Sequence, residues 1–172
     1  LLIDEEKILL NNKIVLDEKK NSRPDYKEKN TPTYSDVLPN DIIFTSTKKT
    51  EEKDFKFILR CVPFCERPFF RYDSTGPSHR NSNLPIPIEE QQVPTPHFHR
   101  FVADGKEIAY KTKVLLDEKQ SKVLEDISMC VLHFMQEANI KFENFDLISP
   151  SVLPFKMEEN IDPLENVQFD IE

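Results

Sequence analysis

The sequence predicts a single-domain α+β protein, with an antiparallel sheet of about five strands against a long C-terminal helix and a short N-terminal helix. Three observations support this class. Residues 41–47, 54–62 and 97–112 are rich in strand-forming residues or alternate between apolar and polar ones. Apolar residues recur at helical spacing over 118–139. The 172 residues correspond to one ordinary domain with extensions.

The N-terminal 40 residues are predicted to form a helix and then a loop. Asp4 can cap a helix over residues 4–13, and Glu5 and Glu6 suit the positive end of the helix dipole. Residues 17–40 are polar and carry three prolines, so we expect a long loop there.

The central region is predicted to form the first strands of the sheet. Residues 41–47 are β-branched and apolar, which favours a strand. The segment 54–62 alternates and places four apolar side chains on one face: Phe55, Phe57, Leu59 and Cys61. The two segments are predicted to pair as an antiparallel hairpin, and residues 68–74 to form a third strand.

A proline-rich loop is predicted to separate these strands from a second hairpin. Residues 75–96 hold five prolines, a density that excludes a helix or a central strand. Residues 97–103 and 106–112 are expected to form strands joined by an Asp-Gly turn at 104–105.

The strongest helix signal covers residues 118–139. Asp117, with Gln120 three residues later, resembles a capping box. The predicted domain spans residues 1–141. Residues 142–172 hold eight acids and one base, which is −7 of the total −8, and are predicted to form a loosely ordered acidic tail.

Composition excludes several classes of protein. Two glycines are too few for a phosphate-binding P-loop or a dinucleotide fingerprint. Three cysteines without a CxxC pair argue against a disulfide framework or a zinc ribbon. No run of about 18 apolar residues occurs, so no membrane span is expected. The acidic first residues do not match a signal peptide, which predicts a cytoplasmic protein.

Histidine and arginine gather in the middle of the chain. Five of six arginines and three of four histidines lie between residues 60 and 100. On a strand, His97 and His99 would project to the same side, and so would Arg71 and Asp73 on the neighbouring strand. His79, on the connecting loop, could fold back over that face.

This cluster suits metal-independent RNA cleavage. One histidine would remove the 2′-OH proton and another would protonate the departing 5′-oxygen, because the pKa of imidazole lies near neutrality. His79, His97 and His99 are the candidates for proton transfer, and Asp73 would orient a histidine or an arginine. Four residues are candidates for phosphate binding: Arg71, Arg80, Asn81 and Arg100.

Two other interpretations of the cluster remain open. The three histidines and Asp73 match the ligand types of zinc or non-haem iron, but nearby arginines would repel a cation, so metal ranks second and no cofactor is expected. Alternatively, the histidines are hydrogen-bonded structural residues. His133, in the predicted long helix, is assigned that structural role.

The stretch FFRYDSTGPSHRN…IPIEEQQVPTPHFHRF resembles an uncharacterised bacterial family with an R-x-D…G-x-P-H-R-N…P-H-x-H pattern. The present chain has a longer spacer and Gly-Pro-Ser-His in place of Gly-x-Pro-His. More distantly, RYDS…H…PHFH is similar to the TumE-type toxins of toxin–antitoxin modules. That likeness implies a small intracellular toxin that acts on RNA and is silenced by an antitoxin, with five residues carried over: Arg71, Asp73, His79, His97 and His99.

The sequence therefore predicts an endoribonuclease toxin of a prokaryotic or phage defence system. Its expected partners are an RNA substrate and a cognate antitoxin or a host defence protein, and a homodimer stays open. The rival is a non-enzymatic phage inhibitor, such as an anti-CRISPR or anti-defence protein, whose acidic tail at 142–172 imitates nucleic acid.

Overall fold

A mixed nine-stranded sheet dominates the computed structural model, which describes residues 2–20, 23–38, 41–50, 53–63, 65–82, 84–102 and 105–149. Eight strands follow one another across the sheet: β11 (Glu107–Tyr110), β10 (His97–Phe101), β7 (Cys65–Asp73), β6 (Phe55–Cys61), β5 (Ile42–Lys49), β4 (Arg23–Tyr34), β1 (Lys7–Leu9) and β12 (Ile140–Lys141). The ninth, β3 (Glu18–Lys20), also pairs with β4. Every pair is antiparallel except β1 with β12, which is parallel.

Smaller elements surround this sheet. Two further strand pairs form, one between β2 (Lys13–Val15) and β13 (Asp146–Ile148) and one between β8 (His79–Arg80) and β9 (Gln92–Val93). The helices are short: η1 (Ile88–Glu90), α1 (Lys113–Leu116), α2 (Glu118–Val123) and α3 (Ile127–Glu137).

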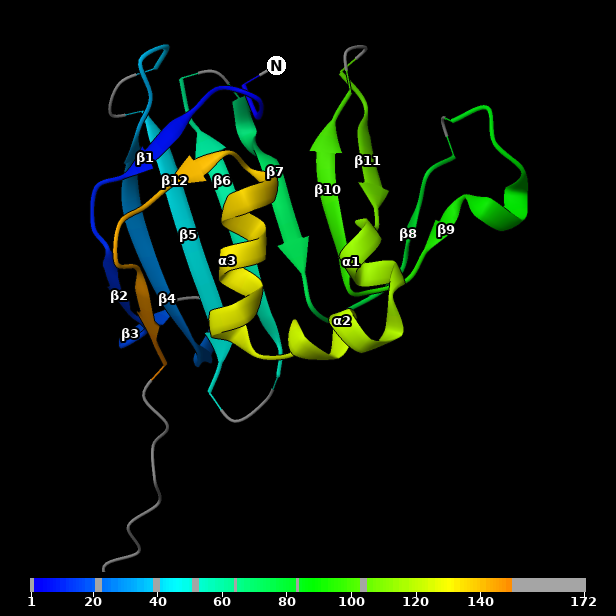
Figure 1. The fold of residues 1–172 in the computed structure, drawn as a ribbon. Helices are drawn as coiled ribbons and strands as arrows, with labels where there is room; N and C mark the ends of the chain where they lie inside the picture. The colour runs from blue at the N-terminus through cyan, green and yellow to red at the C-terminus, as the bar shows by residue number, and fades with distance from the viewer. Residues whose placement is uncertain are drawn as a thin grey trace, which may run out of the picture.

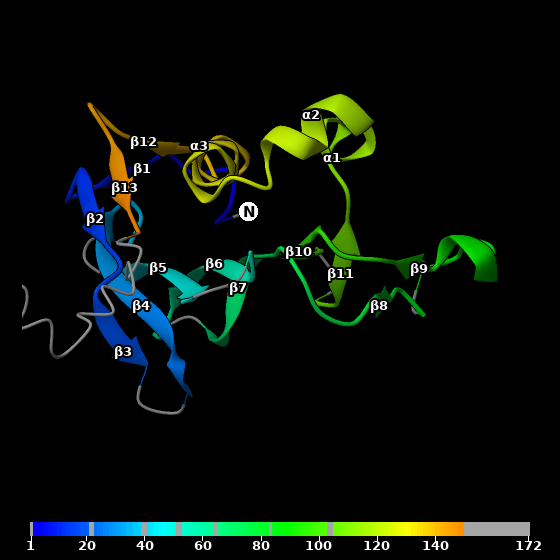
Figure 2. The ribbon, with the colours of Figure 1, turned by 90° about the horizontal axis from the view of Figure 1, so that it is seen from below.

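The sheet curls around α3, and the core lies between them. Figures 1 and 2 show α3 lying along one face of β5, β6 and β7. Phe134 on α3 sits at the centre, with its ring centroid 5.0–6.2 Å from those of four phenylalanines on four neighbouring strands: Phe44, Phe57, Phe70 and Phe98. These five side chains are fully buried. The strand twist that curls the sheet lets one helix cover several strands.

Each strand divides its side chains between two faces. On β7, Phe70 and Tyr72 face α3, and on β10, Phe98 does so. Because the side-chain period of a strand is two, Arg71 and Asp73 of β7 point to the opposite side, which we call the outer face.

The predicted fold class is wrong, because the protein is mostly β and no long helix occurs among the described residues. The predicted helix over 118–139 is interrupted after Val123. The first piece ends at its C-cap Leu124, and Asp126 starts the second, since its carboxylate accepts hydrogen bonds from the backbone N–H groups of Ser128 and Met129. Capping by an internal aspartate therefore outweighs the continuous apolar spacing.

The predicted N-terminal helix is replaced by strand β1. Its Lys7 is fully buried, and its ammonium donates to the backbone carbonyls of Ile3, Glu5 and Ala138. Ala138 is the C-cap of α3, where a positive charge is favourable. Pairing with β4 and β12 and this long-range cap fix an extended conformation that local helix signals do not reveal.

The predicted loop over 17–40 instead supplies β3 and the 12-residue β4. Pro32 is tolerated because a proline lacks only the N–H, and its carbonyl accepts from the backbone N–H of Leu10. Alternate polar residues, including Thr31 and Thr33, are buried in this strand. A strand whose buried side chains are largely polar gives a weak hydrophobic pattern.

The other predicted strands are confirmed. β5, β6 and β7 occur where the sequence places them, and the four apolar residues of 54–62 form the buried face of β6. The second hairpin forms as β10 and β11, although its Asp104 lies outside the described residues. The predicted loop over 75–96 holds β8, η1 and β9 in an otherwise irregular chain.

Most of the predicted acidic tail, residues 142–172, lies outside the residues that the structure describes. Residues 146–148 form β13, and Leu147 is buried. Residues 150–172 are not described, so the order of the tail and its imitation of nucleic acid stay predictions. Among the described helices, none has the length and apolar character needed to cross a membrane.

Candidate functional site

Strand register brings the predicted site residues together on the outer face. β10 pairs with β7 so that His97 lies opposite Asp73 and His99 opposite Arg71. The register of β6 with β7 places Lys56 opposite Asp73 from the other side. Three adjacent strands therefore converge on Asp73.

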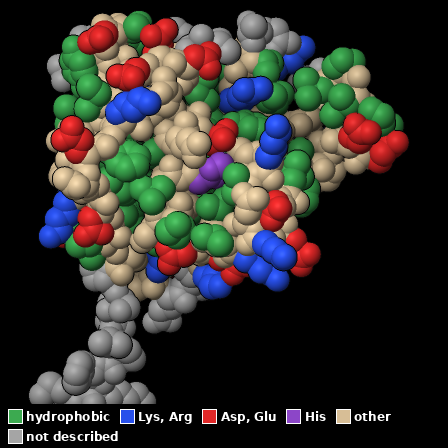
Figure 3. All heavy atoms as spheres, in the orientation of Figure 1, with side chains coloured by type: hydrophobic (Ala, Val, Ile, Leu, Met, Phe, Trp, Pro, Cys, Tyr) green, Lys and Arg blue, Asp and Glu red, His purple; other side chains and the backbone are tan. Residues whose placement is uncertain are grey.

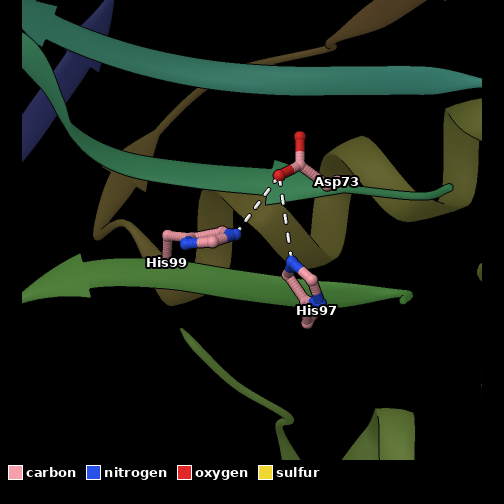
Figure 4. A group of neighbouring side chains, drawn as sticks. All are labelled: Asp73, His97 and His99. Carbon is pink, nitrogen blue, oxygen red and sulfur yellow. Dashed lines mark ion pairs between the residues drawn. The ribbon is translucent and has the colours of Figure 1, made fainter. Parts of the chain in front are cut away.

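Asp73 is the centre of this cluster, and Figure 4 shows both histidines of β10 directed at its carboxylate. Its Oδ2 lies 3.2 Å from Nε2 of His99 and 3.9 Å from Nε2 of His97. The three residues are nearly inaccessible, with relative exposures of 6% for Asp73, 1% for His97 and 3% for His99. A charged carboxylate at this depth requires cationic partners.

Those partners are Arg71 and Lys56. Nε of Arg71 lies 3.0 Å from Oδ2 of Asp73, and Nζ of Lys56 lies 3.0 Å from Oδ1. Both cationic side chains keep about a third of their surface exposed, 29% for Arg71 and 36% for Lys56. They can therefore reach solvent while holding the buried carboxylate.

Glu107 of β11 binds the other side of the cluster. Its Oε1 lies 3.2 Å from Nδ1 of His99 and 3.5 Å from Nη2 of Arg71. His99 is thus placed between two carboxylates, those of Asp73 and Glu107. An imidazolium can donate one N–H to each of them.

The three site histidines differ in proton affinity. Burial alone lowers the pKa of His99, but hydrogen bonds to Asp73 and Glu107 outweigh it, so the net pKa is raised. In His79 and His97, burial lowers the pKa, and the charge of His99 adds to the effect. His99 is therefore the imidazole that holds a proton most readily.

The carboxyl of Asp73 stays ionised for a related reason. Burial would raise its pKa, but the hydrogen bond from His99 and the charges of Arg71 and Lys56 together hold the pKa below its ordinary value. The cluster thus contains an ionised carboxylate among cationic side chains.

His79 reaches the cluster from the loop between β7 and β10. Its ring centroid is 4.8 Å from that of His99, which in turn is 4.5 Å from that of His97. Asn81 anchors this loop: its Nδ2 donates to the carbonyl of Ala109 at 2.8 Å, and its Oδ1 accepts from the N–H of Ala109 at 2.9 Å. Since Ala109 is the β11 neighbour of His99 in the sheet, this anchor holds His79 over His99.

A polar cavity of about 330 Å³ opens beside His79. Its wall includes Glu107 and the cations Arg67, Arg80 and Lys106. This position connects the cavity to the buried cluster through two shared residues, His79 and Glu107.

Three of the four predicted phosphate-binding residues make contacts away from the histidine cluster. Arg100 lies on the opposite face of β10 from the histidines, with its guanidinium 4.9 Å from the ring centroid of Tyr110. The amide of Asn81 is used by the backbone of β11. Arg80 is exposed, and its Nε donates to Oε1 of Gln91 at 3.3 Å. Of the four, Arg71 alone contacts the histidine cluster directly.

The sequence interpretation missed Lys56 and Glu107. Lys56 lies on the outer face of β6, directly across from Asp73 of β7. The only indication in the sequence is that these two residues of paired strands have opposite charges. Glu107 lies across from Phe101 in the second hairpin, which places it beside His99. Both could be found only after the strand register was known.

The cluster also has the donors of a metal site. One ligand atom each from Asp73, His97 and His99 lies within 4.8 Å of the others, a set that matches zinc or non-haem iron. Arg71, however, lies with Nη2 at 3.0 Å from Nε2 of His99 and Nε at 3.0 Å from Asp73. A metal ion would have to displace this guanidinium.

The side of the molecule that carries α3 shows no comparable cluster of charges of one sign in Figure 3. In Figure 3, which views that side, acidic and basic side chains are interspersed and do not gather by sign. A nucleic-acid backbone would find no continuous basic track on the surface seen in this view.

Comparison with known proteins found no matching family model, no matching curated protein and no matching solved structure. Any function assigned to the protein therefore has to be argued from the side chains of the site.

Proposed function

We propose that the protein is a metal-independent endoribonuclease of the toxin type, with His79 and His99 as its proton-transfer pair. The observation that carries this proposal is the edge-on contact of their rings, whose centroids are 4.8 Å apart, where His79 also lines a cavity with three cationic side chains. The opposite shifts of the two pKa values support the pairing, because a raised and a lowered pKa suit an acid and a base.

The reaction follows from these roles. Neutral His79 takes the proton of the 2′-OH, and the 2′-oxygen attacks the adjacent phosphorus. The bond from phosphorus to the 5′-oxygen breaks, and protonated His99 donates to that oxygen the proton on Nδ1, which faces Glu107 when no substrate is bound, while Nε2 stays with Asp73. The products are a 2′,3′-cyclic phosphate and a 5′-hydroxyl, with no change of oxidation state.

Charge stabilisation comes from Arg71 and Lys56. Both are partly exposed and border the buried carboxylate, so a phosphate can approach them from solvent. Asp73 and Glu107 position His99. For the phosphate to enter, the loop that carries His79 has to move outward, because the two imidazoles are in contact.

The toxin–antitoxin context is part of the proposal. All five residues that carry the resemblance to TumE-type toxins lie in this one cluster: Arg71, Asp73, His79, His97 and His99. Residues that are separated in sequence but gathered in space are more readily explained by a shared chemical role than by chance. An antitoxin partner would then act by covering the outer face.

The test is cleavage of total RNA by purified protein in the presence of EDTA. We expect cleavage with 2′,3′-cyclic phosphate ends, and a loss of about 100-fold or more in the His79→Ala and His99→Ala variants. Arg71→Ala should also lose activity, whereas Arg100→Ala, the same change on the opposite sheet face, should not.

Three results would overturn the assignment: intact RNA with the wild-type protein, wild-type activity in His79→Ala, or activity that appears only when a divalent metal is added. The last result would favour the donor set of Asp73, His97 and His99 as a metal centre. Circular dichroism of each variant shows whether its fold is retained.

A further inference from the structure

The cavity beside His79 has two kinds of wall. One part is cationic and carries Arg67, Arg80 and Lys106, all of them exposed. The other part is apolar and includes Phe101, Leu84 and Ile108, each half-buried. Arg67 and Phe101 come from β7 and β10, the strands that also carry the site residues.

The charges of this wall favour an anion. Three cationic side chains face one carboxylate, that of Glu107, which already binds His99. The Nε of Arg80 is held by Gln91, which orients the guanidinium. Arginine guanidinium groups bind phosphate oxygens with two parallel hydrogen bonds, so this wall suits a phosphate group.

The apolar wall suits a nucleobase. Phe101 follows His99 by two residues on β10, so both side chains lie on the outer face. Phe101 and His79 both line the cavity. Aromatic rings bind unstacked bases by stacking, and every base offers a face for it.

We infer that this cavity binds the nucleotide next to the cleaved bond, and that the substrate is therefore single-stranded RNA. The inference rests on the proposed function. A volume of about 330 Å³ lies at the small end of ligand pockets, about 300–1,000 Å³, and suits one nucleotide. A base inside a duplex is stacked and paired, so it would have to leave the helix before it could enter.

The experiment separates binding from cleavage. Calorimetric titration of the purified full-length chain with a nucleoside 3′-monophosphate measures binding in the absence of any cleavable bond. In parallel, single-stranded and duplex RNAs of equal sequence are compared for cleavage. We expect mononucleotide binding and a strong preference for the single strand.

Variants in the cavity should weaken binding without altering the histidines. Phe101→Ala should weaken mononucleotide binding by about 5- to 150-fold, the loss of one base stack. Arg67→Ala should weaken it and also reduce its salt dependence. In cleavage, Phe101→Ala is expected to raise KM more than it lowers kcat, because the base does not react.

Matched controls remove the same groups elsewhere. Arg100→Ala deletes an arginine on the opposite face of β10, and Phe142→Ala deletes an exposed phenylalanine whose ring packs at a tilt against Phe145. Both should bind mononucleotide as the wild type does. Conservative Phe101→Tyr should retain binding if stacking is its role.

The results distinguish failure of the cavity assignment from failure of the proposed ribonuclease activity. RNA cleavage without mononucleotide binding, or with equal rates on duplex and single strand, overturns the cavity assignment alone. Mononucleotide binding that Arg67→Ala and Arg100→Ala affect equally also overturns it. Binding without any RNA cleavage overturns the enzymatic proposal and leaves the cavity as a nucleotide-binding site.

Discussion

The two faces of β7 and β10 carry opposite chemistry on the same backbone. Phe70, Tyr72 and Phe98 pack against α3, whereas Asp73 and His99 meet on the outer face. Neighbouring residues of one strand therefore serve different purposes.

The difference between the faces lies in what holds them together. On the α3 face, rings pack against rings, and the side chains of the core are uncharged. On the outer face, His99, Arg71 and Lys56 stabilise the buried carboxylate of Asp73. One face contributes stability through apolar burial, and the other holds titratable groups at a cost in desolvation.

The α3 face should show the largest effect on stability. Phe134→Ala removes the ring that touches four phenylalanines, and we expect a loss of about 3–5 kcal/mol in the free energy of unfolding. Urea unfolding followed by circular dichroism measures it. Phe142→Ala, at an exposed ring, should change stability by less than about 1 kcal/mol. Equal losses would mean that Phe134 is not the centre of the core.

On the outer face, Asp73→Ala should cost less. It leaves Arg71 and His99 without their carboxylate, but the partial exposure of Arg71 lets solvent compensate, so we expect about 2–3 kcal/mol, below the 3–5 kcal/mol of a fully buried pair. The double variant Arg71→Ala/Asp73→Ala should lose less than the sum of the single losses. An additive result in the same urea assay would show that the ion pair does not couple the two residues.

The link between the two hairpins should show a smaller, local effect. Asn81→Ala removes two hydrogen bonds to Ala109, which corresponds to about 1–2 kcal/mol. Hydrogen exchange at the amide of Ala109 should become faster, while exchange in β5 and β6 should not change. Unchanged protection of Ala109 would contradict the anchoring role.

The smallest expected effect is a difference between the two faces in how the free energy of unfolding depends on pH. Because the pKa of Asp73 is lower in the folded protein than in the unfolded chain, its stabilising contribution is present above the unfolded pKa and is lost as pH falls toward the folded pKa. Between neutral and acid pH, the free energy of unfolding should fall less steeply in Asp73→Asn than in the wild type. The difference between the two slopes should correspond to the uptake of at most one proton on unfolding. Phe134→Leu, a change on the α3 face, should leave the slope as it is. An unchanged slope in Asp73→Asn would mean that this carboxyl does not titrate with folding.

Local sequence was sufficient where the pattern of a strand was strong. The alternation of Phe55, Phe57 and Leu59 predicted both the strand and its buried face, and the Asp-Gly turn predicted the second hairpin. The i, i+2 spacing also predicted that His97 and His99 share a side. These features depend on the period of the backbone, which the residues themselves reveal.

Sequence patterns failed where partners distant in the chain decide the structure. The residues around Lys7 read as a helix because nothing nearby shows that a carbonyl of Ala138 will accept from its ammonium. The sequence of β4 is polar and therefore resembles a loop. What makes it a strand is its backbone pairing with β5, which no local pattern of apolar residues reveals.

The sequence by itself determined which residues could do chemistry and, for each strand, which side chains share a face. Only the tertiary structure decided which of them meet: it joined Lys56 and Glu107 to the cluster, folded His79 over His99, and left Arg100 on the other side of the sheet. The physical reason is that strand register and the path of the 74–96 loop are set by contacts across the whole molecule, whereas periodicity is a property of each segment alone.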